Sequence, residues 1–261
     1  MAKQSQQSVE VEVIEVVRGE LEFCIKGTTP IIFNRYSDKA KRELFMPYKK
    51  TKVEKETSLK HQPLHEFRQS VYPLPKPAKT YLGLPSTAVK SAMMTAALDM
   101  PGLTKTSIGR LVYVLGDYIE IYGKPEVFIT MVRSAGMNST PDVRTRAIVR
   151  EWAAKIRVAF IKPQHKEKGI INLMAAAGIT AGVGDFRPEK GKGTYGQFEL
   201  TTAGDKDFKR VVNTGARDAQ VEAMSDASPY DEDTRDLLDW FQTEAKHRGW
   251  EFTENGEAVK L

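Results

Sequence analysis

The sequence GVGDFRPEKGKGTYGQFEL, residues 182–200, is the most informative stretch of this chain. It contains five glycines, three cationic side chains and three aromatic ones, and its last residues alternate in character as strand residues do. Glycine lets a backbone turn sharply and approach a ligand closely. Cations bind phosphates, and aromatic rings stack on bases. The stretch therefore predicts a loop that contacts nucleic acid and leads into a strand.

The segments around this loop predict an α+β fold. Alternation of apolar and polar residues predicts strands over 9–17, 20–33, 110–121, 127–132, 147–160 and 196–202. Helices are expected over 87–98 and 166–178, and an amphipathic helix over 231–248. This order, with helices between groups of strands, is compatible with one or two split-βαβ units.

Charge divides the chain into a basic body and an acidic tail. Residues 205–261 hold 8 Lys+Arg against 14 Asp+Glu, whereas residues 1–204 hold 31 against 20. Within the body, residues 35–70 carry ten cations and five anions, and 35–79 has no clean helical face, so we expect a long basic insertion there. The expected organisation is a nucleic-acid-binding body (1–204) with an insertion (35–79), followed by an acidic helical tail (205–261). Such a body suits a polyanionic partner.

Composition narrows the class of protein. The chain has 261 residues, of which 41% are hydrophobic and 28% are charged, as is usual for globular proteins. Its apolar runs are too short to span a membrane, and its first residues contain no apolar signal core. Cys24 is the only cysteine, which excludes a disulfide framework. We therefore expect a cytoplasmic protein with no membrane partner.

Three segments resemble the RAMP superfamily (repeat-associated mysterious proteins), the RNA-binding subunits of CRISPR effector complexes. They are an opening strand that runs into GTTPII (27–32), LPSTAVKSA (84–92), which is like the family's PxSxxKxA element, and the late helix followed by the glycine-rich loop. Residues 183–198 are also similar to phage-encoded proteins of unknown role. The resemblance implies a ferredoxin-like (RRM-like) core, an RNA-binding face, and a projecting thumb formed by the insertion.

The resemblance implies a non-catalytic, antiviral-defence subunit of a ribonucleoprotein. Copies would polymerise as a helical homo-oligomer along a single-stranded guide RNA, present it for pairing with a DNA or RNA target, and contact other effector subunits. No cofactor and no metal are expected. The candidate nucleic-acid contacts are Lys49, Lys50 and Lys52 in the insertion, Lys90 in the first helix, Arg133, Arg144 and Arg146 beside a polar turn, and Phe186, Arg187, Lys190, Lys192 and Tyr195 in the glycine-rich loop.

Two alternatives remain open at this point. A phage single-stranded DNA-binding or annealing protein would use the same phosphate and stacking contacts. A metal-independent endoribonuclease of the same superfamily would use His165 for acid–base chemistry. His61 and His65 have the spacing of a helical metal pair, but Pro63 lies between them and no HExxH pattern is present. The sequence therefore predicts no catalytic residue.

Overall fold

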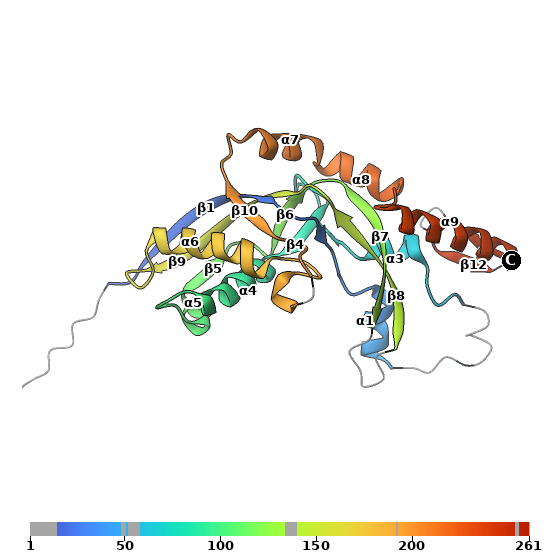
Figure 1. Cartoon of the computed structure of the whole chain (residues 1–261), viewed down its shortest axis with the longest axis horizontal. Coiled ribbons are helices and arrows are strands. Elements are labelled where there is room, and N and C mark those ends of the chain that lie inside the picture. Colours follow the sequence, from blue (N-terminus) through green and yellow to red (C-terminus); the bar gives the residue numbers. More distant parts are fainter. Residues whose placement is uncertain are drawn as a thin grey trace, which may run out of the picture.

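The computed structural model describes residues 15–47, 51, 58–133, 140–191, 193–253 and 256–260. Within these residues the chain alternates strands and helices and ends in three helices and a hairpin (Figure 1). The elements are β1 (Val17–Gly27), β2 (Ile31–Ile32), α1 (Asp38–Phe45), α3 (Pro63–Gln69), β3 (Tyr72–Pro73), β4 (Leu82–Pro85), α4 (Ser86–Ala96), η1 (Ala97–Asp99), α5 (Lys105–Leu111), β5 (Val112–Val114), β6 (Tyr118–Tyr122), β7 (Pro125–Arg133), β8 (Pro141–Val149), β9 (Ala153–Lys162), α6 (Glu167–Ala176), η2 (Ala177–Ala181), η3 (Pro188–Lys190), β10 (Phe198–Thr201), α7 (Lys206–Thr214), α8 (Arg217–Ser225), α9 (Glu232–His247), β11 (Trp250–Phe252) and β12 (Ala258–Lys260).

The main sheet is antiparallel, with the strand order β10-β1-β9-β6-β4-β3, and β5 also pairs with β9. Along the chain, α4 lies between β1 and the β5–β6 pair, and α6 lies between β9 and β10. A β-α-β-β-α-β path with the fourth strand beside the first is the ferredoxin-like arrangement. The α+β, ferredoxin-like fold class expected from the sequence is therefore confirmed.

Helices cover both faces of this sheet. On one face, α4 and α6 bury Val89, Met93, Ile170 and Leu173, none of which is more than 1% exposed. Figure 1 shows α4, α5 and α6 below the sheet and α7 and α8 above it. The strand β9 requires cover on both faces because most of its residues are apolar and buried. Only Lys155 and Arg157, in its middle, are exposed.

A second sheet, β2-β8-β7, carries the candidate site. The β7–β8 hairpin pairs from Pro125 opposite Val149 to Arg133 opposite Pro141. It extends away from the main sheet past α1 and α3 (Figure 1). Phe67 of α3 is fully buried, and the Ser70 hydroxyl accepts a 2.8 Å hydrogen bond from the backbone of Ala147 on β8. The base of the hairpin is thus fixed to α3.

The acidic tail packs directly onto the body. The Gln220 side chain of α8 is fully buried, and its oxygen accepts from the backbone N–H groups of Tyr81 and Leu82 at 2.7 and 3.0 Å. Its nitrogen lies 2.7 Å from the Ile121 carbonyl oxygen. Met224 and Leu238 belong to the main hydrophobic core. The tail is therefore continuous with the core, although its composition differs.

Several element predictions are confirmed and others are wrong. The helices expected over 87–98, 166–178 and 231–248 correspond to α4, α6 and α9, and the strand expected over 127–132 lies within β7. The single strand expected over 110–121 is wrong, since α5 ends at Leu111 and a turn at Gly116 separates β5 from β6. The Thr104 hydroxyl accepts from the Ser107 backbone N–H and so begins that helix.

The second part of the insertion expected over 35–79 packs into the core of the protein. Pro63 occupies the first turn of α3, where its missing N–H costs nothing, and the helix then buries Phe67. Val71 is fully buried, and β3 joins the main sheet. The expected boundary at 79 is therefore too late, because residues 63–73 belong to the core. Within the described residues, no helix has the length and apolar character needed to cross a membrane.

Candidate nucleic-acid interface

The glycine-rich loop folds back onto the body of the protein. The Asp185 and Gly196 backbone N–H groups donate to the carbonyls of Ile32 and Pro30, at 3.0 and 2.8 Å. Gly184 has a φ of +83°, and a Cβ there would lie 2.7 Å from the Ile32 carbonyl oxygen. A side chain at this position would therefore meet backbone. Gly184 therefore accommodates close packing of the loop against the chain itself.

Arg146 and Phe186, both candidate contacts, are engaged in interactions within the protein. Arg146 on β8 has a side chain only 6% exposed, and its Nη1 lies 2.7 Å from Asp185 Oδ2. The same guanidinium lies 5.3 Å from the centroid of the Phe186 ring. Burial lowers the pKa of Arg146, and the Asp185 carboxylate opposes that shift. Arg146 and Phe186 therefore hold the loop to β8 in this structure.

Arg187 and Tyr195 also have internal partners. Arg187 Nε lies 2.7 Å from Glu189 Oε2, and its Nη1 donates to the Gly184 carbonyl at 2.9 Å. Glu189 in turn accepts from the Thr95 hydroxyl of α4 at 2.8 Å. The Tyr195 ring packs 6.3 Å from that of Phe128. Sequence reasoning treated these groups as free for nucleic acid because their partners come from distant segments.

The remaining candidates are scattered or lie outside the described residues. Lys190 is exposed in the glycine-rich loop, and Arg133 and Arg144 are exposed on the β7–β8 hairpin. Lys90 Nζ lies 5.1 Å from the centroid of the Tyr113 ring. Lys49, Lys50, Lys52 and Lys192 fall outside the part of the chain that the structure describes. The structure thus brings Arg144 and Arg146 to one strand, but the other predicted contacts among the described residues lie on separate elements.

A wide groove lies beside these residues, between α1, α3 and β8. Its volume is about 1510 Å³, and residues 34–46, 59–70, 142–146 and 257–258 contribute to its lining. The residues that line it include six Lys+Arg and five Asp+Glu. Positive charges exceed negative ones by one among the lining residues, so the positions of individual cations decide what the groove can bind.

Ion pairs neutralise part of the groove wall. Asp142 Oδ1 lies 2.9 Å from Lys60 Nζ and 3.3 Å from His61 Nε2, and the other ring nitrogen of His61 lies 3.2 Å from Glu66. Burial acts to raise the pKa of Asp142, but the hydrogen bond from Lys60 and the nearby positive charges lower it overall. These pairs join residue 60 and α3 to β8. At this part of the groove the charges of Lys60 and Asp142 therefore neutralise each other.

Helix α1 supplies cations that remain available. Lys39 and Arg42 are exposed, and within the described residues neither side chain forms an ion pair. The helix begins at Ser37, whose hydroxyl accepts from the Ala40 backbone N–H at 3.1 Å. Arg35 is held at its base by Asp38, at 3.1 Å. The groove therefore has one wall with free positive charge.

Exposed aromatic rings accompany these cations. Tyr36 is 70% exposed, and Phe45, at the end of α1, is 91% exposed. Cations interleaved with exposed rings are what a single-stranded nucleic acid requires for phosphate and base contacts. The sequence carried this signal in residues 35–47, where an aromatic residue stands at either end of a basic helix. Sequence reasoning selected the lysines further along the insertion instead.

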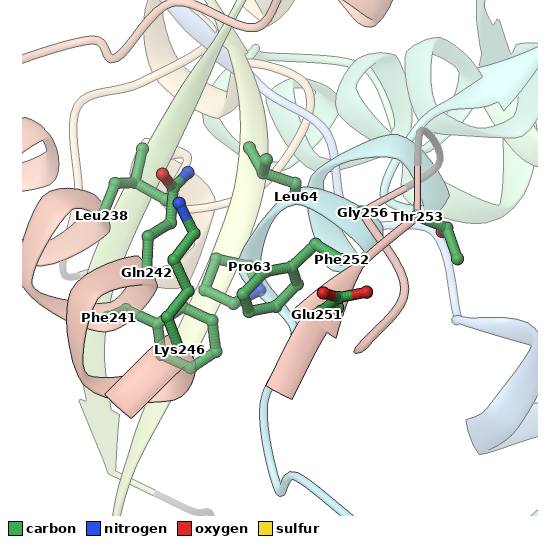
Figure 2. Close-up of a pocket in the computed structure, with 10 residues that line it drawn as sticks. All are labelled: Pro63, Leu64, Leu238, Phe241, Gln242, Lys246, Glu251, Phe252, Thr253 and Gly256. Atoms are coloured by element: carbon green, nitrogen blue, oxygen red, sulfur yellow. The ribbon is translucent and has the colours of Figure 1, made fainter. Parts of the chain in front are cut away.

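A second cavity, of about 450 Å³, lies between α3, α9 and β11 (Figure 2). Its walls are mainly apolar, with Pro63, Leu64 and Leu238 beside a pair of rings, Phe241 and Phe252, whose centroids are 5.8 Å apart. Lys246 is the one cation among the described residues that line it. This cavity marks the junction of tail and body, and its apolar lining is unsuited to phosphates.

His165, the residue considered for acid–base chemistry, is largely enclosed by the protein. His165 is only 7% exposed, its Nε2 lies 3.2 Å from the Ser107 hydroxyl oxygen, and burial lowers its pKa. Among the residues that the structure describes, no three His, Cys, Asp or Glu side chains are grouped in a way that could hold a metal ion.

Comparisons with known proteins find weak structural similarity only. No protein-family model matches the chain, and no curated protein matches it. A chain in the cryo-EM structure of the type III-B Cmr-beta complex bound to cognate target RNA matches with 11% identity and a TM-score of 0.36, over 69% of this chain and 59% of that one. Cmr6 from Pyrococcus furiosus matches with 10% identity and a TM-score of 0.36, over 71% and 98%. This chain thus spans about three fifths of the length of the first match.

Proposed function

We propose that this protein binds single-stranded RNA in the groove between α1 and the β7–β8 hairpin. The observation that carries the proposal is the groove wall formed by α1, where Lys39 and Arg42 have no ion pair among the described residues and lie between the exposed rings of Tyr36 and Phe45. Lys39 and Arg42 contact phosphates, and the exposed rings of Tyr36 and Phe45 contact bases. Phosphate contacts give affinity without sequence preference, as a protein that holds guides of differing sequence requires.

We further propose that copies of the chain lie side by side on one strand and present its bases for pairing with a target. Such an arrangement requires that the strand leave the groove of one copy and enter the groove of the next. The resemblance of residues 27–32, 84–92 and 182–196 to RAMP subunits supports the same role. In this arrangement the protein acts without a catalytic residue.

Binding to labelled oligouridine over a salt series tests the first proposal. Affinity is expected to fall as salt rises, with a slope of about −0.7 per phosphate contact in a log–log plot. Absent binding, or binding that does not change with salt, would overturn it. Increasing the oligonucleotide length tests the arrangement along the strand, since bound copies should increase stepwise with length. A second, complementary strand should then anneal without releasing the protein.

Two assays address the alternatives. Nucleic acid that co-purifies with the protein should be a discrete RNA; recovery of DNA, or tighter binding to oligothymidine of the same length, would favour the single-stranded DNA alternative. Incubation of labelled RNA with the protein in the absence of metal tests cleavage. Because His165 is buried beside Ser107, the intact RNA is expected to persist. Cleavage that His165→Ala abolishes would establish the nuclease.

A further inference from the structure

Two tyrosines lie side by side on an open part of the main sheet. Tyr72 on β3 pairs with Gly83 on β4, and Gly83 pairs with Glu120 on β6. Paired residues share a face of the sheet, and so do residues two apart along a strand, which places Tyr118 on the same face as Tyr72. The two ring centroids are 5.9 Å apart with an interplanar angle of 44°. Gly83 has no side chain to separate them.

The same face is covered elsewhere. Tyr122, four residues along β6 from Tyr118, is only 5% exposed because Phe208 and Val211 of α7 pack against it. Its hydroxyl lies 3.2 Å from Glu120 Oε2. Tyr118, by contrast, is 48% exposed, and Tyr72 is partly exposed. The cover provided by α7 therefore ends before the Tyr72–Tyr118 pair and leaves these two rings open to a ligand.

The tyrosine pair adjoins the groove through Arg35 and Tyr36. Both of these residues line the groove, and Arg35 donates a backbone hydrogen bond of 2.8 Å to the Ser70 carbonyl, just before Tyr72. Both residues also influence the pKa of the Tyr72 hydroxyl. Burial raises this pKa, Tyr118 and Tyr36 raise it further, and the positive charge of Arg35 opposes the rise. Arg35 and Tyr36 therefore line the groove and also lie near Tyr72.

We propose that Tyr118 and Tyr72 form a stacking platform for one unpaired base of the strand whose phosphates occupy the groove. The inference rests on the proposed function and names a base-binding subsite for it. A base that stacks on the exposed face of Tyr118 is held by its π-surface, so any base fits. Arg35 stands where the adjoining phosphate enters the groove. Such a platform would fix the register of the strand relative to the protein.

Substitution of the rings separates stacking from charge. Tyr118→Leu and Tyr72→Leu should each weaken binding of labelled oligouridine by about 5- to 100-fold, the range expected for loss of one base–aromatic stack. The factor should be the same at every salt concentration, because no phosphate contact is lost. Tyr118→Phe should bind as the parent protein does. Trp240→Leu, which removes a ring 63% exposed on α9, is the matched control and should have no effect.

An oligonucleotide scan locates the base. Each nucleotide in turn is replaced by an abasic linker, and one position should weaken binding to the parent protein but not to Tyr118→Leu. If the parent protein binds in a salt-dependent manner and the tyrosine variants bind equally well, the proposed stacking platform is overturned, whereas the proposed binding of RNA in the groove is not. If the parent does not bind at all, the proposed function itself fails. Because Tyr118 is exposed, its variant carries the test even if Tyr72→Leu unfolds.

Discussion

Arg146 on β8 and Asp185 in the glycine-rich loop form an ion pair in which Nη1 and Oδ2 are 2.7 Å apart. The arginine side chain is 6% exposed and the aspartate side chain 27%. The two residues are 39 positions apart in sequence and join the second sheet to the loop that precedes β10. Because a buried cation without its partner is strongly unfavourable, this pair secures the loop.

Asp185→Asn should destabilise the protein by about 2 kcal/mol, below the 3–5 kcal/mol typical of a fully buried pair because Asp185 keeps some contact with water. Urea unfolding followed by circular dichroism measures the change. Asp239→Asn, at an exposed position of α9, is the control and should lie within about 0.5 kcal/mol of the parent. Equal stability of both variants would show that the pair contributes nothing. The double variant Arg146→Met, Asp185→Leu should recover part of the loss.

Neutralising the free cations of α1 should weaken binding to RNA through charge alone. The variant Lys39→Gln, Arg42→Gln loses about two phosphate contacts, so the salt slope should become shallower by about 1.4. Fluorescence anisotropy with labelled oligouridine provides both affinity and slope. The control is Lys206→Gln, Lys209→Gln on α7, which lies on the far side of the molecule from α1 (Figure 1). A loss of the same size in the control would mean that binding depends on overall charge and has no site.

The core of the fold was accessible from the sequence because its signals are local. The β1 alternation, the apolar runs of α4 and α6, and the strand after the glycine-rich loop each lie within one segment. Their order alone indicates split-βαβ units. The first part of β8 was missed because Asp142, Arg144 and Arg146 give it the polar character of a turn. Its last residues, 147–149, were joined to β9 in one predicted strand, because all three are apolar and nothing in the sequence marks the break before Ala153.

The site was harder to predict because its chemistry depends on distant partners. Arg146 and Arg187 look like free cations in the sequence, and only the fold shows that Asp185 and Glu189 neutralise them. The opposite holds for Tyr72 and Tyr118, which are 46 residues apart and become neighbours only through β4. Charge segregation was visible in the sequence; the pairing of individual charges was not.

Protein stability should decline as the pH falls through the histidine range, in part because of His165. Burial lowers the pKa of folded His165, whereas in the unfolded chain it is about 6.5. As the pH falls through that value, the unfolded chain takes up a proton that the folded protein does not, and unfolding is favoured. The unfolding midpoint in urea should therefore be lower at about pH 5.5 than at about pH 7.5. His165→Gln should reduce this difference; an unchanged difference would exclude His165 as its source.

Gln220→Leu should be among the most destabilising substitutions in the acidic tail. The Gln220 side chain is fully buried and satisfies the backbone N–H groups of Tyr81 and Leu82 as well as three carbonyls. Leucine leaves the Tyr81 and Leu82 N–H groups without partners, whereas the Gly215 carbonyl keeps the N–H of Gly123. Each unsatisfied buried group costs about 1–3 kcal/mol, so a loss of about 3 kcal/mol is expected. The control is Gln242→Leu, since Gln242 makes no side-chain hydrogen bond to any described residue. Thermal unfolding should show one transition in the parent protein, because α8 and the main sheet share this contact. Separate melting of tail and body would contradict a single cooperative core.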